Sequence, residues 1–307
     1  FFCFFGWFGI APLMAVVRED LSLTQDQIGN LIIASVLVTV FGRVIIGPLV
    51  ERFGPRRVYT GLLALGAIPV MSIGLADSYE SFLIARLAIG VIGASFVLTQ
   101  FHCSVMFAPN VVGLANATTA GWGNAGGGAT QMLMPLIFAG IVALGVPESL
   151  GWRLAMVVPG VVLLAMAVVY WFGTQDAPDG DFAELRARGE LPATANKGGG
   201  FESLRAAALD YRVWALFFMY GACFGVELTI HNVAALYYFD EFGVSLKTAG
   251  LLAGVFGVLA LFARAVGGWT SDKLAHRLGL PGRVWLLFGA LLAEGLLLML
   301  FSQMQVL

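Results

Sequence analysis

The sequence predicts an all-α, polytopic membrane protein, and two observations indicate this class: its composition and the length of its apolar blocks. Of the 307 residues, 59% are hydrophobic and 12% are charged, whereas an ordinary soluble domain has about 25% charged residues. The apolar residues form blocks of about 18 to 28 residues, the length that an α-helix needs to cross a bilayer. We therefore expect most of the chain to lie in contact with membrane lipid.

Charged and turn-forming residues divide the chain into nine apolar blocks, each of which is a predicted membrane span. The divisions include Gly54-Pro55 and Pro109-Asn110, where a helix is expected to end. The predicted spans are residues 1–17, 28–50, 58–76, 81–107, 113–144, 152–173, 211–238, 247–270 and 284–302.

The basic residues indicate how the spans are oriented. When the loop at residues 51–57 is placed in the cytoplasm, eleven basic residues share its side and three lie on the opposite side, in agreement with the positive-inside rule. Residues 174–210 form the longest polar stretch and contain the flexible run Lys197-Gly198-Gly199-Gly200. We expect this stretch to be a cytoplasmic linker between a six-helix bundle at residues 1–173 and three further helices at 211–307.

A spaced pattern of residues occurs twice. Each copy has an arginine, a glycine four residues later, and then an acid and a base: Arg43, Gly47, Glu51 and Arg52 in the first copy, and Arg264, Gly268, Asp272 and Lys273 in the second. The copies end spans two and eight, so they run in the same direction across the membrane, as in the parallel six-helix halves of the major facilitator superfamily. We expect the acids and bases at the cytoplasmic helix ends, and the two glycines to let a neighbouring helix pack closely.

The arginines of the two copies are predicted to lie at the same depth. Each is eight residues from its acid, or about 12 Å along a helix, which is near the middle of a hydrocarbon core of about 30 Å. Placing a charged arginine there costs about 2.5–3.5 kcal/mol of insertion free energy. A carboxylate could offset this cost, and either Glu227 or Glu294 could neutralise each arginine in this way. We favour a shared site for Arg43 and Arg264 instead, because a guanidinium is a planar fork of donors that fits a small planar anion. For Arg86, in span four, a structural or gating role and substrate contact both remain open.

Span five contains a run of glycines. Gly121, Gly123 and Gly126 match the dinucleotide pattern G-x-G-x-x-G, but no strand is predicted beside them and both flanks are apolar, so the context excludes that site. Glycines at helical spacing instead let helices cross closely and slide, which we expect of the run's five glycines, Gly121, Gly123, Gly126, Gly127 and Gly128. The amide of Asn124 needs a partner in hydrocarbon, and a substrate oxygen could accept from it.

The run from Gly121 to Gly128 resembles the signature motif of the nitrate/nitrite porter family within the major facilitator superfamily. Residues 4–14, 42–48, 223–229 and 262–272 resemble that family's first, second, seventh and eighth helices. The resemblance implies that Arg43 and Arg264 bind the substrate and that Asn124 faces it. It also implies that Phe96 and Tyr220 line the cavity, with packing as the open alternative. Because members of the superfamily have twelve spans, we expect this sequence to be part of a longer protein with an incomplete C-terminal bundle.

The resemblance implies secondary active transport of nitrate or nitrite by alternating access across the cytoplasmic (inner) membrane, by a monomer. Import of an anion against a negative interior costs about 2.3 kcal/mol per 100 mV, so a cation must accompany it or another anion must leave. Glu227, the only acidic residue expected near the cavity, is the candidate proton carrier, or else a packing carboxylate that balances an arginine. His231 is a second candidate, or else a hydrogen-bonded structural histidine.

We favour symport of nitrate with protons, and the alternatives are a nitrate/nitrite exchanger and a non-transporting nitrate sensor. An enzyme is not expected, because no nucleophile or acid pair gathers at one membrane face. The three cysteines lie in apolar segments without metal-ligand spacing, so we expect neither a metal nor a disulfide. No cofactor and no nucleic acid is expected as a partner.

Overall fold

The structure is a computed structural model that describes residues 1–108, 111–191 and 200–304, and within these ranges it is helical. Nine of the described segments are long and apolar enough to cross a membrane, and they coincide with the nine predicted blocks. The predicted all-α class of a polytopic membrane protein is therefore confirmed. Pro109-Asn110 and residues 197–199 of the glycine run lie outside the described residues.

The first six spans form what we call the N-terminal half, residues 1–173. Several of these spans consist of two or three successive helical segments. Their elements are α1 (Phe2–Trp7), η1 (Ala11–Leu13), α2 (Met14–Asp20), α3 (Gln25–Phe53), α4 (Pro55–Ser72), η2 (Ile73–Leu75), α5 (Tyr79–Gly90), η3 (Val91–Ala94), α6 (Ser95–Met106), α7 (Val112–Ala143), α8 (Glu148–Ala155) and α9 (Val157–Gly173).

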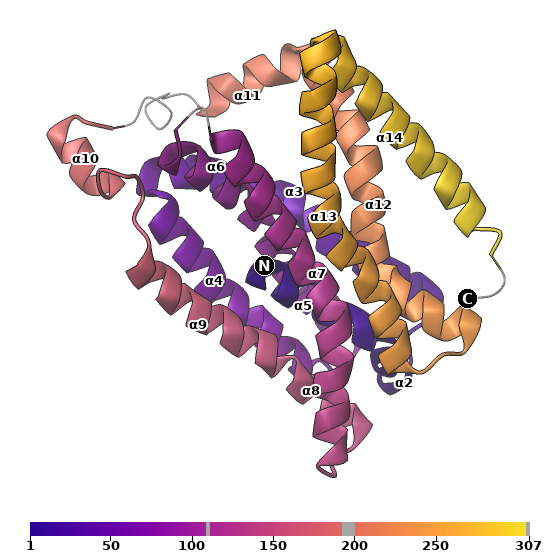
Figure 1. Ribbon diagram of the computed structural model, residues 1–307. Helices are drawn as coiled ribbons and strands as arrows, with labels where there is room; N and C mark the ends of the chain where they lie inside the picture. The colour runs from indigo at the N-terminus through magenta and orange to yellow at the C-terminus, as the bar shows by residue number, and fades with distance from the viewer. Residues whose placement is uncertain (109–110, 192–199, 305–307) are drawn as a thin grey trace.

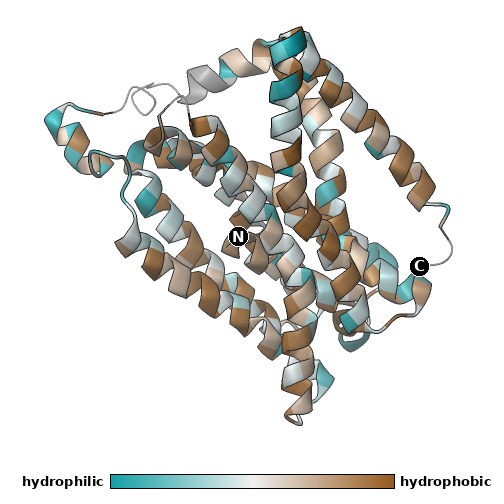
Figure 2. Ribbon diagram, viewed as in Figure 1, coloured by the Kyte–Doolittle hydropathy of each residue, from teal (hydrophilic) through white to brown (hydrophobic). Residues whose placement is uncertain are grey.

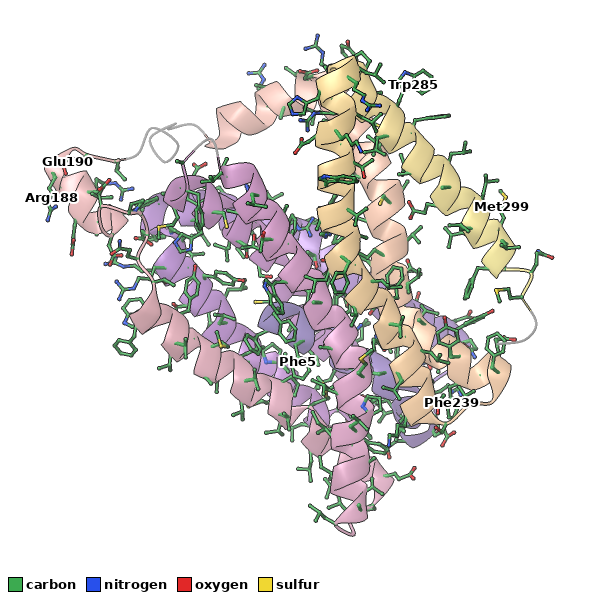
Figure 3. All side chains as sticks on the ribbon, viewed as in Figure 1. Phe5, Arg188, Glu190, Phe239, Trp285 and Met299 are labelled. Atoms are coloured by element: carbon green, nitrogen blue, oxygen red, sulfur yellow. The ribbon has the colours of Figure 1, made fainter. Side chains whose placement is uncertain are left out.

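The last three spans form what we call the C-terminal half, residues 211–304. They are α12 (Tyr211–Phe242), α13 (Leu246–Leu278) and α14 (Leu280–Phe301), and the preceding polar stretch carries α10 (Phe182–Arg188) and α11 (Gly200–Leu209). Hydrophobic residues cover the long helices, whereas hydrophilic ones gather near the helix ends and on α10 (Figure 2). On α14, Trp285 and Met299 point away from the other helices (Figure 3), with 67% and 70% of their surface exposed. This exposed apolar surface is what contact with lipid requires.

The turn at the predicted Gly54-Pro55 division ties the start of the linker to the N-terminal half. Gly54 has a φ of +86°, which a residue with a Cβ rarely adopts. The carboxylate of Asp176 accepts from the backbone N–H groups of Arg56 at 2.7 Å and Phe182 at 2.9 Å. Burial raises the pKa of the Asp176 carboxyl, and these two hydrogen bonds oppose the rise. The carboxylate thus holds residues 176–182 against the end of α3 and the start of α4.

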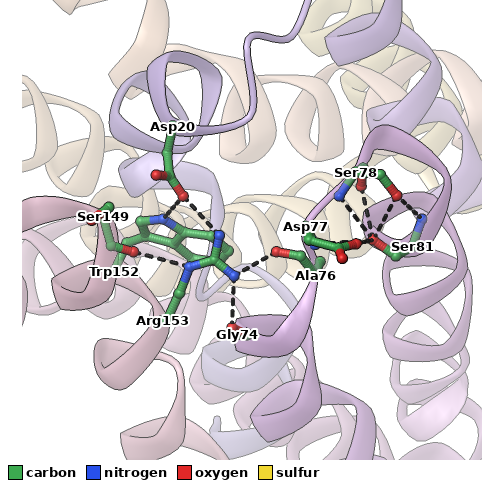
Figure 4. A network of polar contacts seen from close by, with 9 residues as sticks. All are labelled: Asp20, Gly74, Ala76, Asp77, Ser78, Ser81, Ser149, Trp152 and Arg153. Carbon is green, nitrogen blue, oxygen red and sulfur yellow. Dashed lines mark hydrogen bonds and ion pairs between the residues drawn. The ribbon is translucent and has the colours of Figure 1, made fainter.

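At the opposite end of the bundle, polar groups join three spans. Asp20 accepts from the indole of Trp152 and from Arg153, both at 2.9 Å, and Arg153 also donates to the carbonyl of Gly74 at 2.9 Å (Figure 4). On the same side, Arg18 of α2 forms a two-pronged ion pair with Asp240 of α12, with distances of 2.6 and 2.8 Å. The two halves are therefore bridged on the side away from the linker.

The closest approach between the halves is the crossing of α7 and α13, which meet near their lower ends in Figure 1 and diverge towards α11. A Cβ added at Gly128 would lie 2.8 Å from the Cα of Gly257 and 2.9 Å from the carbonyl oxygen of Gly254. A Cβ at Gly127 would lie 2.9 Å from the ring of His231. Backbones can meet this closely only where side chains are absent, so these glycines occupy the tight crossing that their spacing predicts.

The same expectation is wrong for Gly47 and Gly268. Among the described residues, no atom lies within 4 Å of a Cβ built at either position. The reason is that α3 packs through the face that includes Gly42, Ile46 and Val50, beside Gly47 rather than through it. On α13 the buried residues end at Gly257, well before Gly268.

The α7–α13 crossing predicts unequal effects for two alanine substitutions on one helix. Gly128→Ala should lower the Tm of the purified protein by several degrees, because overpacking costs about 1–3 kcal/mol. Gly140→Ala is the matched control, since no described atom lies within 4 Å of its new Cβ, and it should leave the Tm unchanged or raise it slightly. Thermal unfolding in detergent measures both, and equal shifts would contradict the packing described for α7.

Candidate anion-binding site

Arg43 and Arg264 come from opposite halves, on α3 and α13, and both side chains are half-buried. Both guanidinium groups are close enough to the hydroxyl of Tyr220 on α12 to interact with it electrostatically. The Nε of each arginine is buried without a hydrogen-bond partner among the described residues. The two predicted arginines thus share one neighbour and keep unused donors.

Glu227 of α12 contacts two of the groups predicted to bind the substrate. Its Oε1 accepts a hydrogen bond from the side-chain amide of Asn124, and its Oε2 lies 3.7 Å from Nη2 of Arg264. Asn124 is 1% exposed, and its Oδ1 has no hydrogen-bond partner among the described residues. The alternative in which a carboxylate balances an arginine is therefore found for Arg264, while the six ion pairs of the described residues include none with Arg43.

A second carboxylate belongs to this neighbourhood. Glu294 of α14 is close enough to Glu227 to interact with it electrostatically, and it also contacts Cys223. The expectation that Glu227 is the only acidic residue near the site is therefore wrong. The sequence marks Glu294 as a possible partner of an arginine, but its place in the interior of a 22-residue span does not indicate that it lies beside Glu227.

The aromatic residues implied by the family resemblance are linked through a third ring. Tyr220 stacks on Phe224 with ring centroids 5.1 Å apart, and Phe224 lies 6.4 Å from Phe96. Phe96 also lines a cavity of about 290 Å³ in the N-terminal half, together with Tyr59 and Thr99. The sequence reasoning missed Phe224, since an aromatic residue in an apolar span carries no signal of its own.

His231 lies one helical turn beyond Glu227, with Nε2 3.9 Å from its carboxylate. The ring packs against Phe8 and Phe256. The expected hydrogen-bonded histidine is not found, because neither ring nitrogen has a hydrogen-bond partner among the described residues. The ring also lies close to Gly127, where an added Cβ would come within 2.9 Å of it.

Arg86 lies apart from the paired arginines and is 1% exposed. Its Nη2 donates to Ser35 and to the Oδ1 of Asn232, both at 3.1 Å, and its Nη1 donates to the carbonyl of Trp7 at 3.4 Å. These contacts join α5, α3 and α1 to α12 of the other half. These contacts favour the structural or gating role for Arg86.

The acid and base of each repeat lie at the helix ends, as expected from their spacing. At the end of α3, the backbone carbonyls of Glu51 and Arg52 accept from Arg186 of α10 at 3.4 and 3.0 Å. At the second copy, Asp272 near the end of α13 pairs with Arg283 of α14 at 2.8 Å. The two helix ends therefore have different partners, although their sequences follow the same pattern.

The contacts of Arg86 generate a prediction about stability. Asn232→Ala removes an acceptor from a buried charged donor, which costs about 1–3 kcal/mol, so the Tm should fall by several degrees. Thr229→Ala on the same helix is the control, because that hydroxyl is exposed and bonds only its own helix backbone. Differential scanning fluorimetry in detergent compares the two, and an unchanged Tm for the Asn232 variant would show that Arg86 does not depend on this contact.

Comparison with known proteins gives one family and several relatives. The sequence model of the Major Facilitator Superfamily matches residues 1–306. The chain is 42% identical over 287 residues to "High affinity nitrate transporter 2.5" of Arabidopsis thaliana, covering 93% of this chain and 56% of that protein. It is 26% identical over 341 residues to "Nitrate/nitrite transporter NrtP" of Nostoc punctiforme, covering 90% and 68%. The chain therefore spans little more than half the length of the plant relative.

A solved structure has the same fold. It is a bacterial homologue of the human lysosomal transporter Spinster, in an inward-facing and unoccupied conformation, with a TM-score of 0.68 and 19% sequence identity. The match covers 90% of this chain and 61% of that one. At this identity the likeness concerns the arrangement of the helices alone.

Proposed function

We propose that the chain, which belongs to the Major Facilitator Superfamily and is similar to nitrate and nitrite transporters, transports nitrate or nitrite by alternating access. The observation that carries the proposal is that Arg43 and Arg264, from opposite halves, both lie within electrostatic range of Tyr220, each with a buried Nε that has no partner among the described residues. An anion held by one arginine from each half is in contact with both moving parts. Its binding can therefore favour the closure that alternating access requires.

The chemistry of the two arginines fits a small planar oxyanion. A guanidinium keeps its charge at any working pH and offers two parallel donors to two oxygens of one anion. Asn124, which projects from the glycine-rich crossing, would supply a third donor. The stacked rings of Tyr220 and Phe224 would exclude water from one side of the anion, which strengthens each hydrogen bond.

Transport would be coupled to protons. The inward movement of a monovalent anion against the membrane potential costs about 2.3 kcal/mol per 100 mV, and Glu227 is the carboxylate in contact with the proposed site. Uptake of a proton with each anion would cancel its charge, so the membrane potential would no longer oppose import. On this proposal the protein works as a monomer in the lipid of the cytoplasmic membrane, as a carrier and not as an enzyme.

The arginine pair predicts a severe loss of transport in two single variants. In the full-length protein, Arg43→Lys and Arg264→Lys should each reduce uptake of labelled nitrate into liposomes by about 100-fold, because a bidentate charged pair is worth roughly 3 kcal/mol. Arg277→Lys, at the exposed end of α13, is the matched control and should transport normally. Near-normal uptake by both site variants would refute the anion clamp.

Proton coupling predicts a selective defect at Glu227. Glu227→Gln should abolish nitrate uptake that is driven by an acid-outside pH gradient, since glutamine cannot carry a proton, while exchange of nitrate across the membrane continues. Liposomes with and without the gradient separate these activities. If gradient-driven uptake persists in the variant, proton coupling through Glu227 is wrong, and if the wild type itself shows exchange alone, the protein is an exchanger.

A further inference from the structure

The carboxylate of Glu227 contacts the same groups that the proposed function assigns to the substrate. It accepts from the Asn124 amide through one oxygen and faces Arg264 at 3.7 Å through the other. A carboxylate and a nitrate ion are both planar anions whose charge is shared among oxygens, so the same donors suit both. In this structure, the carboxyl group of Glu227 therefore stands where an oxyanion would be held between α7 and α13.

The hydrogen-bonding capacity of Asn124 indicates what releases Glu227. An ionised carboxylate only accepts hydrogen bonds, whereas a protonated one also donates. The Oδ1 of Asn124 is a buried acceptor without a donor among the described residues. A protonated Glu227 can donate to this oxygen, which leaves the amide N–H and the guanidinium of Arg264 free for another anion.

The charges around the site point in the same direction. The titratable groups that face Glu227 are Arg264 on α13, Glu294 on α14, and Tyr220, Cys223 and His231 on its own helix, and α7 carries no titratable side chain. Arg43 of α3 faces Tyr220. An ionised Glu227 and a nitrate on the same donors would place two negative charges side by side, which is unfavourable away from water. A proton on Glu227 removes that repulsion.

We propose that Glu227 is a tethered competitor for the anion site. Ionised Glu227 holds Asn124 and Arg264, and nitrate binds there only as Glu227 takes up a proton from the solvent and lets go of both. The only covalent bond that forms is the O–H bond of the protonated Glu227 carboxyl, and no covalent bond within the protein or the nitrate breaks. This mechanism rests on the proposed function and deepens it, because it makes coupling a consequence of two anions sharing one set of donors.

The competition fixes the sign of the pH dependence. At low pH the carboxyl is protonated and does not compete, so nitrate affinity is highest. As pH rises through the ionisation of Glu227, affinity should fall by up to about tenfold per pH unit, as linkage of one proton requires. Glu227→Gln removes the competitor, so its nitrate affinity should not vary with pH and, at pH values where wild-type Glu227 is ionised, should exceed the wild-type value.

Isothermal titration of the full-length protein in nanodiscs with sodium nitrate, across a range of pH, tests this. Glu294→Gln is the matched control, because Glu294 lies beside Glu227 but contacts neither Asn124 nor Arg264 among the contacts of the described residues; the pH dependence should persist in it. The proposal is overturned if Glu227→Gln keeps the wild-type pH dependence, or if the pH dependence disappears in the Glu294 variant instead.

A second measurement needs no variant. Titration of the wild type in buffers of different ionisation enthalpy reports the protons taken up per nitrate bound, and the proposal expects a value approaching one at pH values where Glu227 is ionised. Nitrate binding without proton uptake would overturn the competition and leave the proposed transport intact. Absence of nitrate binding at every pH would overturn the proposed function itself.

Discussion

The rest of the structure depends on the need to balance charge inside a membrane. Two arginines near the middle of apolar helices are costly unless anions face them, and in this structure Glu227 faces Arg264 at 3.7 Å, while Arg43 has no carboxylate partner among the described residues. A site with one arginine balanced and one unbalanced favours a second anion. The proposed substrate follows from this imbalance, and the proposed proton follows from the contact of Glu227 with donors that the substrate would also use.

The helix crossing between the halves decides which groups can meet. Gly128 and Gly257 bring α7 and α13 into backbone contact, and this contact places Asn124 and Arg264 on the same carboxylate of α12. The halves are also joined on the side away from the linker, by Arg18 with Asp240 and by Arg86 with Asn232. Towards the linker, α13 has no buried residue beyond Gly257. The described contacts between the halves therefore concentrate at one side, with the arginine pair beyond them.

Sequence patterns predicted what depends on composition and periodicity. The nine spans follow from apolar length alone, and the repeat identified Arg43 and Arg264 as a pair. Patterns failed where the outcome depends on which helix face meets which neighbour. Gly47 and Gly268 have the same spacing but meet no neighbouring helix among the described residues, whereas Asn232, which has no motif, supports Arg86 across the halves. The proximity of Glu294 to Glu227 depends on how α12 and α14 pack, and the residue patterns of these two helices do not indicate that packing.

The central claim is that one anion is held by both Arg43 and Arg264 while Glu227 has withdrawn. The most direct test is a structure of the full-length protein with nitrate, solved at a pH low enough to protonate Glu227. The account predicts an anion within hydrogen-bonding distance of both guanidinium groups and of the Asn124 amide, with the Glu227 carboxyl turned away from Arg264. An anion bound elsewhere, or bound while the contact between Glu227 and Arg264 persists, would contradict it.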